Sequence, residues 1–435
     1  QEVVMRIKFI ALFLVVFSQS VFSAAKIETW QTSQGSPVFY VETKGLPMVD
    51  IRVVFDAGSA RDGYQHGIAA LTSALLDAGA GEWSADDIAQ RLESVGARLA
   101  AGVSKDTAWV SLRSLTEEKL LSKALQTMQA ILSNPSFNET DFQREKSRTL
   151  AGLKHREESP GALANIEFLR ALYKDHPYAH PSSGVVETVS GFTASDLQAF
   201  YQQFYVANNA RVVIVGDVDK QHAAKIAQSL IADLAIGNKP ESIPEVPAPA
   251  KGITKHIQFP STQTHVLAGL VGMHRKDRDY LSLYVGNHIL GGSGLVSQLF
   301  AEVREKRGLA YSTYSYFSPL LRKGPFTMGL QTRNDQTSQA VEVMQNTLKA
   351  FVENGPTEEA LLAAKKNITG GFAMRFDTNS KLISYVSMIG FYQLPLDYLD
   401  TFQQRVDAIS IESIKDAFSR RVKPENINTI TVGGE

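Results

Sequence analysis

A repeated segment constrains the fold of this chain more than any other feature of its 435 residues. The segment from Ser195 to Gly216 aligns without gaps on the segment from Glu412 to Gly433, and both copies read as an amphipathic helix followed by an apolar strand. Arg61-Asp62 falls on Arg278-Asp279 at the same offset. Coincidence is the alternative, because short helix–strand repeats are weak evidence alone. Since the order of predicted elements also returns, duplication of one domain is the better explanation.

The predicted fold class is α+β, with two homologous domains that each contain a mainly antiparallel sheet packed with helices. In the first half, apolar alternation and turn residues predict strands at 36–43, 49–56, 98–103, 107–115 and 210–217, and helices at 117–132 and 140–158. In the second half they predict strands near His256 and at 265–272, 309–320 and 324–333. Residues 237–250 are rich in proline without periodicity, which is typical of a linker. The predicted domains are therefore residues 26–236 and 251–435.

Residues 1–25 predict a secretory signal peptide. Arg6 and Lys8 precede the apolar run 9–17, which is too short for a stable membrane span. Small residues follow, and cleavage is expected after Ser23 or Ala25. Retention of the segment as an anchor is the alternative. We expect a periplasmic protein that has no membrane association once the signal is removed.

Composition excludes several kinds of site. The chain has no cysteine, which excludes disulfides, thiolate zinc sites and a cysteine nucleophile. Its formal charge is −1 without a long basic or acidic block, so nucleic acid is not an expected partner. Neither a Gly-x-Ser-x-Gly elbow nor a phosphate-binding loop ending in Gly-Lys-Ser/Thr is present.

The stretch from Ser297 to Phe317 carries the main functional signal. It predicts the end of an amphipathic helix, with Leu299, Phe300 and Val303 on the apolar face and Gly308 as the C-terminal stop. A strand follows, and simple alternation places Tyr311 and Ser315 on one of its faces.

Arg304 and Tyr311 are therefore separated by one helix-to-strand turn. Both side chains are hydrogen-bond donors, and they can converge on one acceptor, such as a peptide carbonyl. The alternative is that Arg304 is a solvated helix-end cation and Tyr311 a half-buried strand aromatic.

The order and spacing of this region resemble a known family. Leu290-Gly-Gly-Ser-Gly294, Ser-Gln-Leu-Phe300 and Val-Arg-Glu-Lys-Arg-Gly-Leu-Ala-Tyr311 are similar to the C-terminal-domain signature of the pitrilysin/insulinase family of zinc metallopeptidases. That family includes the mitochondrial processing peptidase and bacterial two-chain relatives. The resemblance implies that Arg304 and Tyr311 bind the substrate backbone opposite a zinc ion.

The same resemblance implies a zinc motif, His-x-x-Glu-His, on the first helix of the first half. Two histidines one turn apart would bind the metal, the glutamate would act as base, and a distant glutamate would be the third ligand. Residues 70–74 here are Ala-Leu-Thr-Ser-Ala, and the third-ligand position falls near Leu150-Ala-Gly152. Glu145 matches a family helix residue and not the ligand. We therefore expect no metal bound by this chain.

The nine histidines do not offer an obvious replacement site. His176 and His180 have helical spacing, but Pro177 and Pro181 rule out a regular helix there. His155, His265, His274 and His288 are read as ordinary residues.

The resemblance implies a clamshell of four such domains from two chains. We expect this chain to be the non-metal, substrate-binding subunit of a periplasmic two-chain zinc metallopeptidase that acts on unfolded peptides. Its partners would be a homologous subunit with an intact His-x-x-Glu-His motif, which carries the zinc, and the peptide substrate. Two alternatives stay open: a non-enzymatic scaffold or peptide-binding homolog, and a self-sufficient hydrolase with unrecognised ligands.

Overall fold

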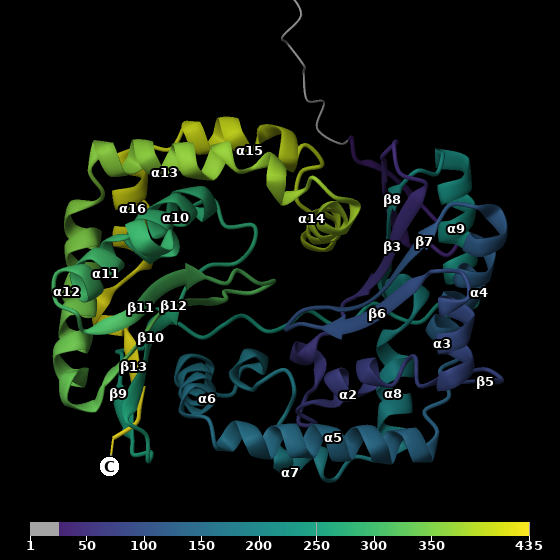
Figure 1. Ribbon diagram of the computed structural model, residues 1–435, viewed down its shortest axis with the longest axis horizontal. Helices are drawn as coiled ribbons and strands as arrows, with labels where there is room; N and C mark the ends of the chain where they lie inside the picture. Colours follow the sequence, from purple (N-terminus) through teal and green to yellow (C-terminus); the bar gives the residue numbers. More distant parts are fainter. Residues whose placement is uncertain (1–25, 249, 435) are drawn as a thin grey trace, which may run out of the picture.

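Two mixed sheets, each covered by helices, form the molecule in the computed structural model (Figure 1). The structure describes residues 26–248 and 250–434, so the predicted signal peptide at 1–25 lies outside the described residues. The first sheet consists of β1 (Glu28–Gln31), β2 (Pro37–Glu42), β3 (Met48–Phe55), β6 (Arg98–Val103), β7 (Ala108–Leu115) and β8 (Ala210–Gly216). The second consists of β9 (Thr254–Ile257), β10 (Gln263–Val271), β11 (Ala310–Phe317), β12 (Pro325–Arg333) and β13 (Asn428–Val432).

The order of strands repeats between the two sheets. The first is ordered β1-β2-β8-β3-β7-β6 and the second β11-β12-β10-β13-β9, so the second matches the first read from β6 to β2. The β2–β8 and β13–β9 pairs are parallel and the other pairs are antiparallel. The aligned sequence segments form α8 (Ala194–Phe204) with β8, and α16 (Ile411–Arg421) with β13. The predicted α+β class with two homologous sheets is confirmed.

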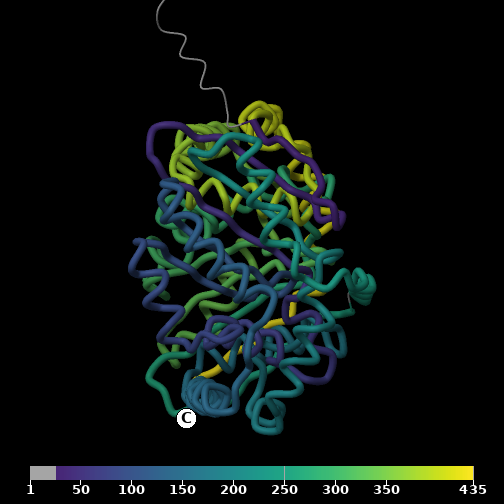
Figure 2. The backbone as a smooth tube through the Cα atoms, turned by 90° about the vertical axis from the view of Figure 1, so that its right-hand side faces the viewer, coloured from purple at the N-terminus to yellow at the C-terminus, as the bar shows by residue number. Residues whose placement is uncertain are grey.

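Each half contributes a helix to the sheet of the other half. Helix α6 (Pro160–Tyr173) packs on β10 and β13, and α14 (Asn379–Tyr392) packs on β3 and β8. In Figure 2 the yellow C-terminal strand accordingly passes among blue and teal segments of the first half. Gly390 permits the close approach of α14, since a Cβ there would lie 2.7 Å from the Phe39 ring. Burial of both helix–sheet contacts makes the two halves depend on each other for their cores.

The segment predicted as a linker packs between the halves. Between α9 (Lys220–Ala232) and β9, the described residues form no helix or strand, yet Ile243 is only 4% exposed. Arg61 of the first half donates to the carbonyl of Glu241 at 2.5 Å, and Arg322 of the second half donates to that of Ile243 at 2.6 Å. The polar, proline-rich composition therefore gives an extended chain that is pinned from both sides.

A single buried carboxylate also joins the halves. Asp106 lies in the turn between β6 and β7 and is fully buried. Its Oδ1 accepts from the hydroxyl of Tyr178 at 2.7 Å, and its Oδ2 accepts from the hydroxyl of Tyr392 at 2.9 Å and the backbone N–H of Leu321 at 2.8 Å. Burial raises the pKa of Asp106, and these three donors oppose that shift. Two of the donors come from the second half.

Replacing Asp106 with alanine is expected to destabilise the whole chain. The buried Tyr178 hydroxyl and two partly buried donors, from Leu321 and Tyr392, would lose their acceptor at about 1–3 kcal/mol each, so the free energy of unfolding should fall by about 3 kcal/mol or more. Asp106→Asn should lower the free energy of unfolding by less than Asp106→Ala does, because the amide oxygen of asparagine can still accept from part of these donors. Urea unfolding provides the measurement, with the exposed Asp335 replaced by alanine as the control. A change in Asp106→Ala within about 0.5 kcal/mol of that control would contradict the role given to this carboxylate.

Candidate functional site

The helix before Gly308 is not a uniform α-helix. It begins as α11 (Gln298–Phe300), capped by the Ser297 hydroxyl, and continues as a π-helical turn over Ala301–Glu305. Gly308, at φ +61°, donates to the carbonyl of Arg304, and the N–H of Leu309 donates to that of Val303. The bond from Gly308 to Arg304 is that of the αL ending, so the predicted stop at Gly308 is confirmed. Helical turns with π geometry occur often at functional sites.

The strand that follows contains a bulge that sequence alternation does not predict. Ala310 pairs with Thr332 and Thr313 with Leu330, so Tyr311 and Ser312 together face one residue of β12. The extra residue reverses the alternation. Tyr311 is 81% exposed, whereas Ser315 is 2% exposed, and the prediction that they share a face is therefore wrong.

The structure brings Arg304 and Tyr311 together. The Arg304 guanidinium carbon lies 4.5 Å from the centroid of the Tyr311 ring and 4.8 Å from that of Phe300. Within the described chain, the Arg304 side chain has neither an ion pair nor a hydrogen bond. Its donors therefore remain available beside an exposed phenol.

Buried polar groups fix the position of the strand behind this pair. The hydroxyl of Ser315 donates to the side-chain carbonyl of Asn287 at 2.7 Å, and the Asn287 amide donates to the carbonyl of Ser315 at 3.0 Å. Gly291 lies so close that a Cβ there would be 2.4 Å from the Ser315 hydroxyl. Asn287 was not predicted as a positioning residue, because only the folded chain brings it to Ser315.

Two partly exposed tyrosines lie on the outer face of β11. Tyr314 and Tyr316 stack with ring centroids 5.7 Å apart and are 40% and 43% exposed. Strand β11 is the edge of its sheet among the described strands, since it pairs with β12 alone. The edge thus offers backbone hydrogen-bonding groups beside Arg304, Tyr311 and two further tyrosines.

The positions implied for a metal site do not fit zinc. They lie on α2 (Ile68–Ala74), where Ser73 is 3% exposed and the buried Thr72 hydroxyl has no hydrogen-bond partner in the described chain. Ala70 and Ala74 supply no donor atom, and α5 (Glu139–Glu157), which packs on α2, presents Ala151 at the third position. Zinc requires imidazole, carboxylate or thiolate ligands, and this donor set contains none. Across the described ranges, no group of three or more His, Asp or Glu side chains is arranged to hold a metal ion.

The two histidines with helical spacing have structural contacts. His180 Nε2 lies 3.2 Å from Asp62 Oδ2, and its ring stacks on that of His66 at 3.9 Å. Asp62 in turn accepts from the N–H groups of Gly67 and Ala69 at the start of α2. His176 Nε2 contacts the carbonyl of Pro244 at 3.0 Å, and burial lowers the pKa of His176. These contacts fix the start of α2 and the linker.

Comparisons with known proteins match both halves. The family model for insulinase (peptidase family M16) matches residues 38–184, and the model for the peptidase M16 inactive domain matches residues 191–368. The chain belongs to the M16 peptidase family. The first match contains the altered motif at 70–74, and the second contains Arg304 and Tyr311.

Similar proteins within the M16 family cover most of the chain. A crystal structure of a peptidase M16 inactive domain from Pseudomonas fluorescens is 36% identical with a TM-score of 0.91, covering 94% of this chain and 98% of that one. The non-peptidase homolog YmxG of Helicobacter pylori is 28% identical over 87% of this chain and 88% of its own length. An uncharacterized zinc protease of Mycobacterium bovis is 30% identical over 69% of each chain. The names of these relatives thus include both a non-peptidase homolog and a zinc protease.

The purified chain is expected to hold no stoichiometric zinc and to cleave no unfolded peptide alone. Placing His, Glu and His at Ala70, Ser73 and Ala74 should not restore zinc binding, because Ala151 still supplies no carboxylate. Elemental analysis of both proteins after dialysis against zinc is the measurement. One tightly bound zinc per unmodified chain would contradict this assignment.

Proposed function

We propose that this M16 chain is the non-metal, substrate-binding subunit of a periplasmic two-chain zinc metallopeptidase acting on unfolded peptides. The observation that carries the proposal is an exposed Arg304–Tyr311 pair on an open strand edge, in a chain whose metal positions hold no ligand. The zinc would belong to a homologous partner with an intact His-x-x-Glu-His motif. The predicted secretory signal peptide at residues 1–25 supports the periplasmic location.

Arg304 and Tyr311 have the chemistry required to bind a peptide carbonyl. The guanidinium is always charged and the phenol is a neutral donor, so both favour an acceptor oxygen that becomes more negative during the reaction. Preorganised donors of this kind stabilise such an oxygen without reorientation. The bulge contributes by turning Tyr311 to the exposed side, next to Arg304.

The edge of β11 supports binding of an extended, unfolded chain. An extended peptide can pair with the free backbone groups of an edge strand, and its alternate side chains then meet the residues that flank that edge. A folded protein has most of its backbone groups already paired and can present only an edge strand or a loop in this way. The proposed substrate is therefore an unfolded segment.

A scaffold role for the same fold is the competing explanation. In that case, the contact of Arg304 with Phe300 and Tyr311 is ordinary packing. The 81% exposure of Tyr311 favours the binding role, since a packed aromatic ring gains stability from being covered.

Mixing this chain with its zinc-bearing partner should produce activity that neither chain has alone. Arg304→Ala and Tyr311→Phe should each lower turnover by about 10- to 1,000-fold, as for other lost oxyanion donors. The free-energy loss in turnover of the double variant should be smaller than the sum of the losses of the two single variants, because both donors serve one acceptor. Peptide cleavage by the mixed chains is the measurement.

The matched controls are Tyr64→Phe and Arg333→Ala, at an exposed tyrosine and an exposed arginine elsewhere. Both should retain full turnover. Assembly of the two chains, followed by size-exclusion chromatography, should persist in every variant. Full activity of the double variant in the assembled pair would reject the binding role and favour the scaffold.

A further inference from the structure

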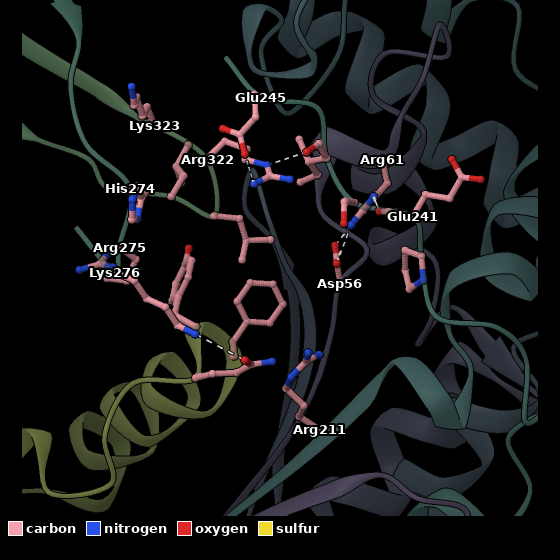
Figure 3. A pocket seen from close by; sticks show the side chains of 18 residues that line it. Asp56, Arg61, Arg211, Glu241, Glu245, His274, Arg275, Lys276, Arg322 and Lys323 are labelled. Carbon is pink, nitrogen blue, oxygen red and sulfur yellow. Dashed lines mark hydrogen bonds and ion pairs between the residues drawn. The ribbon is translucent and has the colours of Figure 1, made fainter. Parts of the chain in front are cut away.

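A cavity of about 570 Å³ lies at the junction of the two halves, and neither Arg304 nor Tyr311 lines it (Figure 3). Its walls come from the end of β3, from β8, from the pinned linker, from the loop after β10 that carries Arg275 and Lys276, from the β11–β12 turn and from the end of α14. Ligand sites of small molecules commonly have this volume and lie between domains. The cavity is therefore large enough for a small ligand in contact with both halves.

The three acidic side chains of the lining leave most of its positive charge uncompensated. Asp56 accepts two hydrogen bonds from Arg61, at 2.8 and 2.6 Å, and Glu245 pairs with Arg322. The carboxylate of Glu241 points away from the centre of the cavity in Figure 3. The acidic groups thus neutralise two of the arginines only.

Four other cations line the cavity without an ion-pair partner among the described residues: Arg211, Arg275, Lys276 and Lys323. Arg211 is half-buried, its hydrogen bond to the carbonyl of Asn209 is long at 3.4 Å, and its guanidinium lies 5.1 Å from the Phe391 ring. Burial lowers the pKa of Arg211, and the nearby charge of Asp56 opposes that shift only in part.

Arg275 is incompletely satisfied as well. Its Nε is buried without a hydrogen-bond partner in the described chain. Its guanidinium lies 5.3 Å from the ring of Tyr392 and 5.7 Å from that of Tyr280. These aromatic faces hold the cation in place, and the acceptor they supply is the Tyr280 hydroxyl, which receives a long hydrogen bond of 3.4 Å from Arg275 Nη1.

A guanidinium removed from water without a counter-ion costs free energy, and a bound anion offsets that cost. The planar fork of donors matches carboxylate and phosphate oxygens. We propose that this cavity binds a compact anion with carboxylate or phosphate groups, held by Arg211 and Arg275. Lys276 and Lys323 add positive charge that attracts it. The anion would be either a free small molecule or an acidic peptide segment.

Calorimetric titration of the full chain with two probes, inorganic tripolyphosphate and a triglutamate peptide, tests the proposal. At about 0.15 M salt, where surface charges are screened, at least one probe should bind at one site per chain. Arg211→Gln and Arg275→Gln should each weaken binding about tenfold or more, as expected for a lost charge-assisted hydrogen bond. Bound probe should also raise the thermal unfolding midpoint.

The matched control is Arg333→Gln, which removes an exposed arginine of β12 that pairs with Asp335 outside the cavity. It should bind the probe as the unmodified chain does, and so should Arg304→Ala, which separates this site from the proposed substrate element. If Arg211→Gln does not fold, Arg275→Gln and the exposed Lys276→Gln provide the test.

Each outcome decides the question. Binding of tripolyphosphate alone assigns a phosphate ligand, and binding of triglutamate alone assigns an acidic peptide; both support the site if the cavity variants weaken it. Binding of neither probe overturns the proposal. Equal weakening by Arg333→Gln also overturns it, because the attraction would then be general to the surface.

Discussion

The contacts of one buried carboxylate hold the two halves in their arrangement. Asp106 receives donors from Tyr178 of the first half and from Leu321 and Tyr392 of the second, in a position without solvent exposure. The exchange of α6 and α14 between the sheets supplies apolar area, but apolar burial is non-directional. Hydrogen bonds to a fixed carboxylate are directional, so they determine the orientation of the second sheet relative to the first.

In both halves, a buried aspartate at the same position of the repeat fixes the start of a helix. Asp62, aligned with Asp279 in the repeat, accepts hydrogen bonds at the start of α2 and contacts His180, in a helix that has no metal ligands at positions 70–74. Asp279 pairs with Arg420 and Arg421, which hold its pKa at about 2, and so ties the start of α10 (Tyr280–Asn287) to α16. Both helices therefore keep their places for structural reasons.

Local pattern was sufficient to predict much of this structure. The repeat predicted two equivalent sheets, and the turn at Gly308 followed from its glycine. Other features depend on contacts between distant segments. The bulge at Tyr311 depends on the register against β12, and no residue type marks it. The helix exchange and the contact of Asn287 with Ser315 also join segments that sequence periodicity cannot relate.

Tyr392 connects the junction to the cavity beside it. Its hydroxyl donates to Asp106, while its ring lies 5.3 Å from the guanidinium of Arg275. An unpaired negative charge and unpaired positive charges thus flank one tyrosine, and no direct ion pair joins Asp106 to an arginine among the described residues. Hydroxyl and N–H donors satisfy Asp106, so this carboxylate forms no ion pair with the cations that line the cavity. The interaction that joins the halves therefore leaves the positive charge of their junction in place.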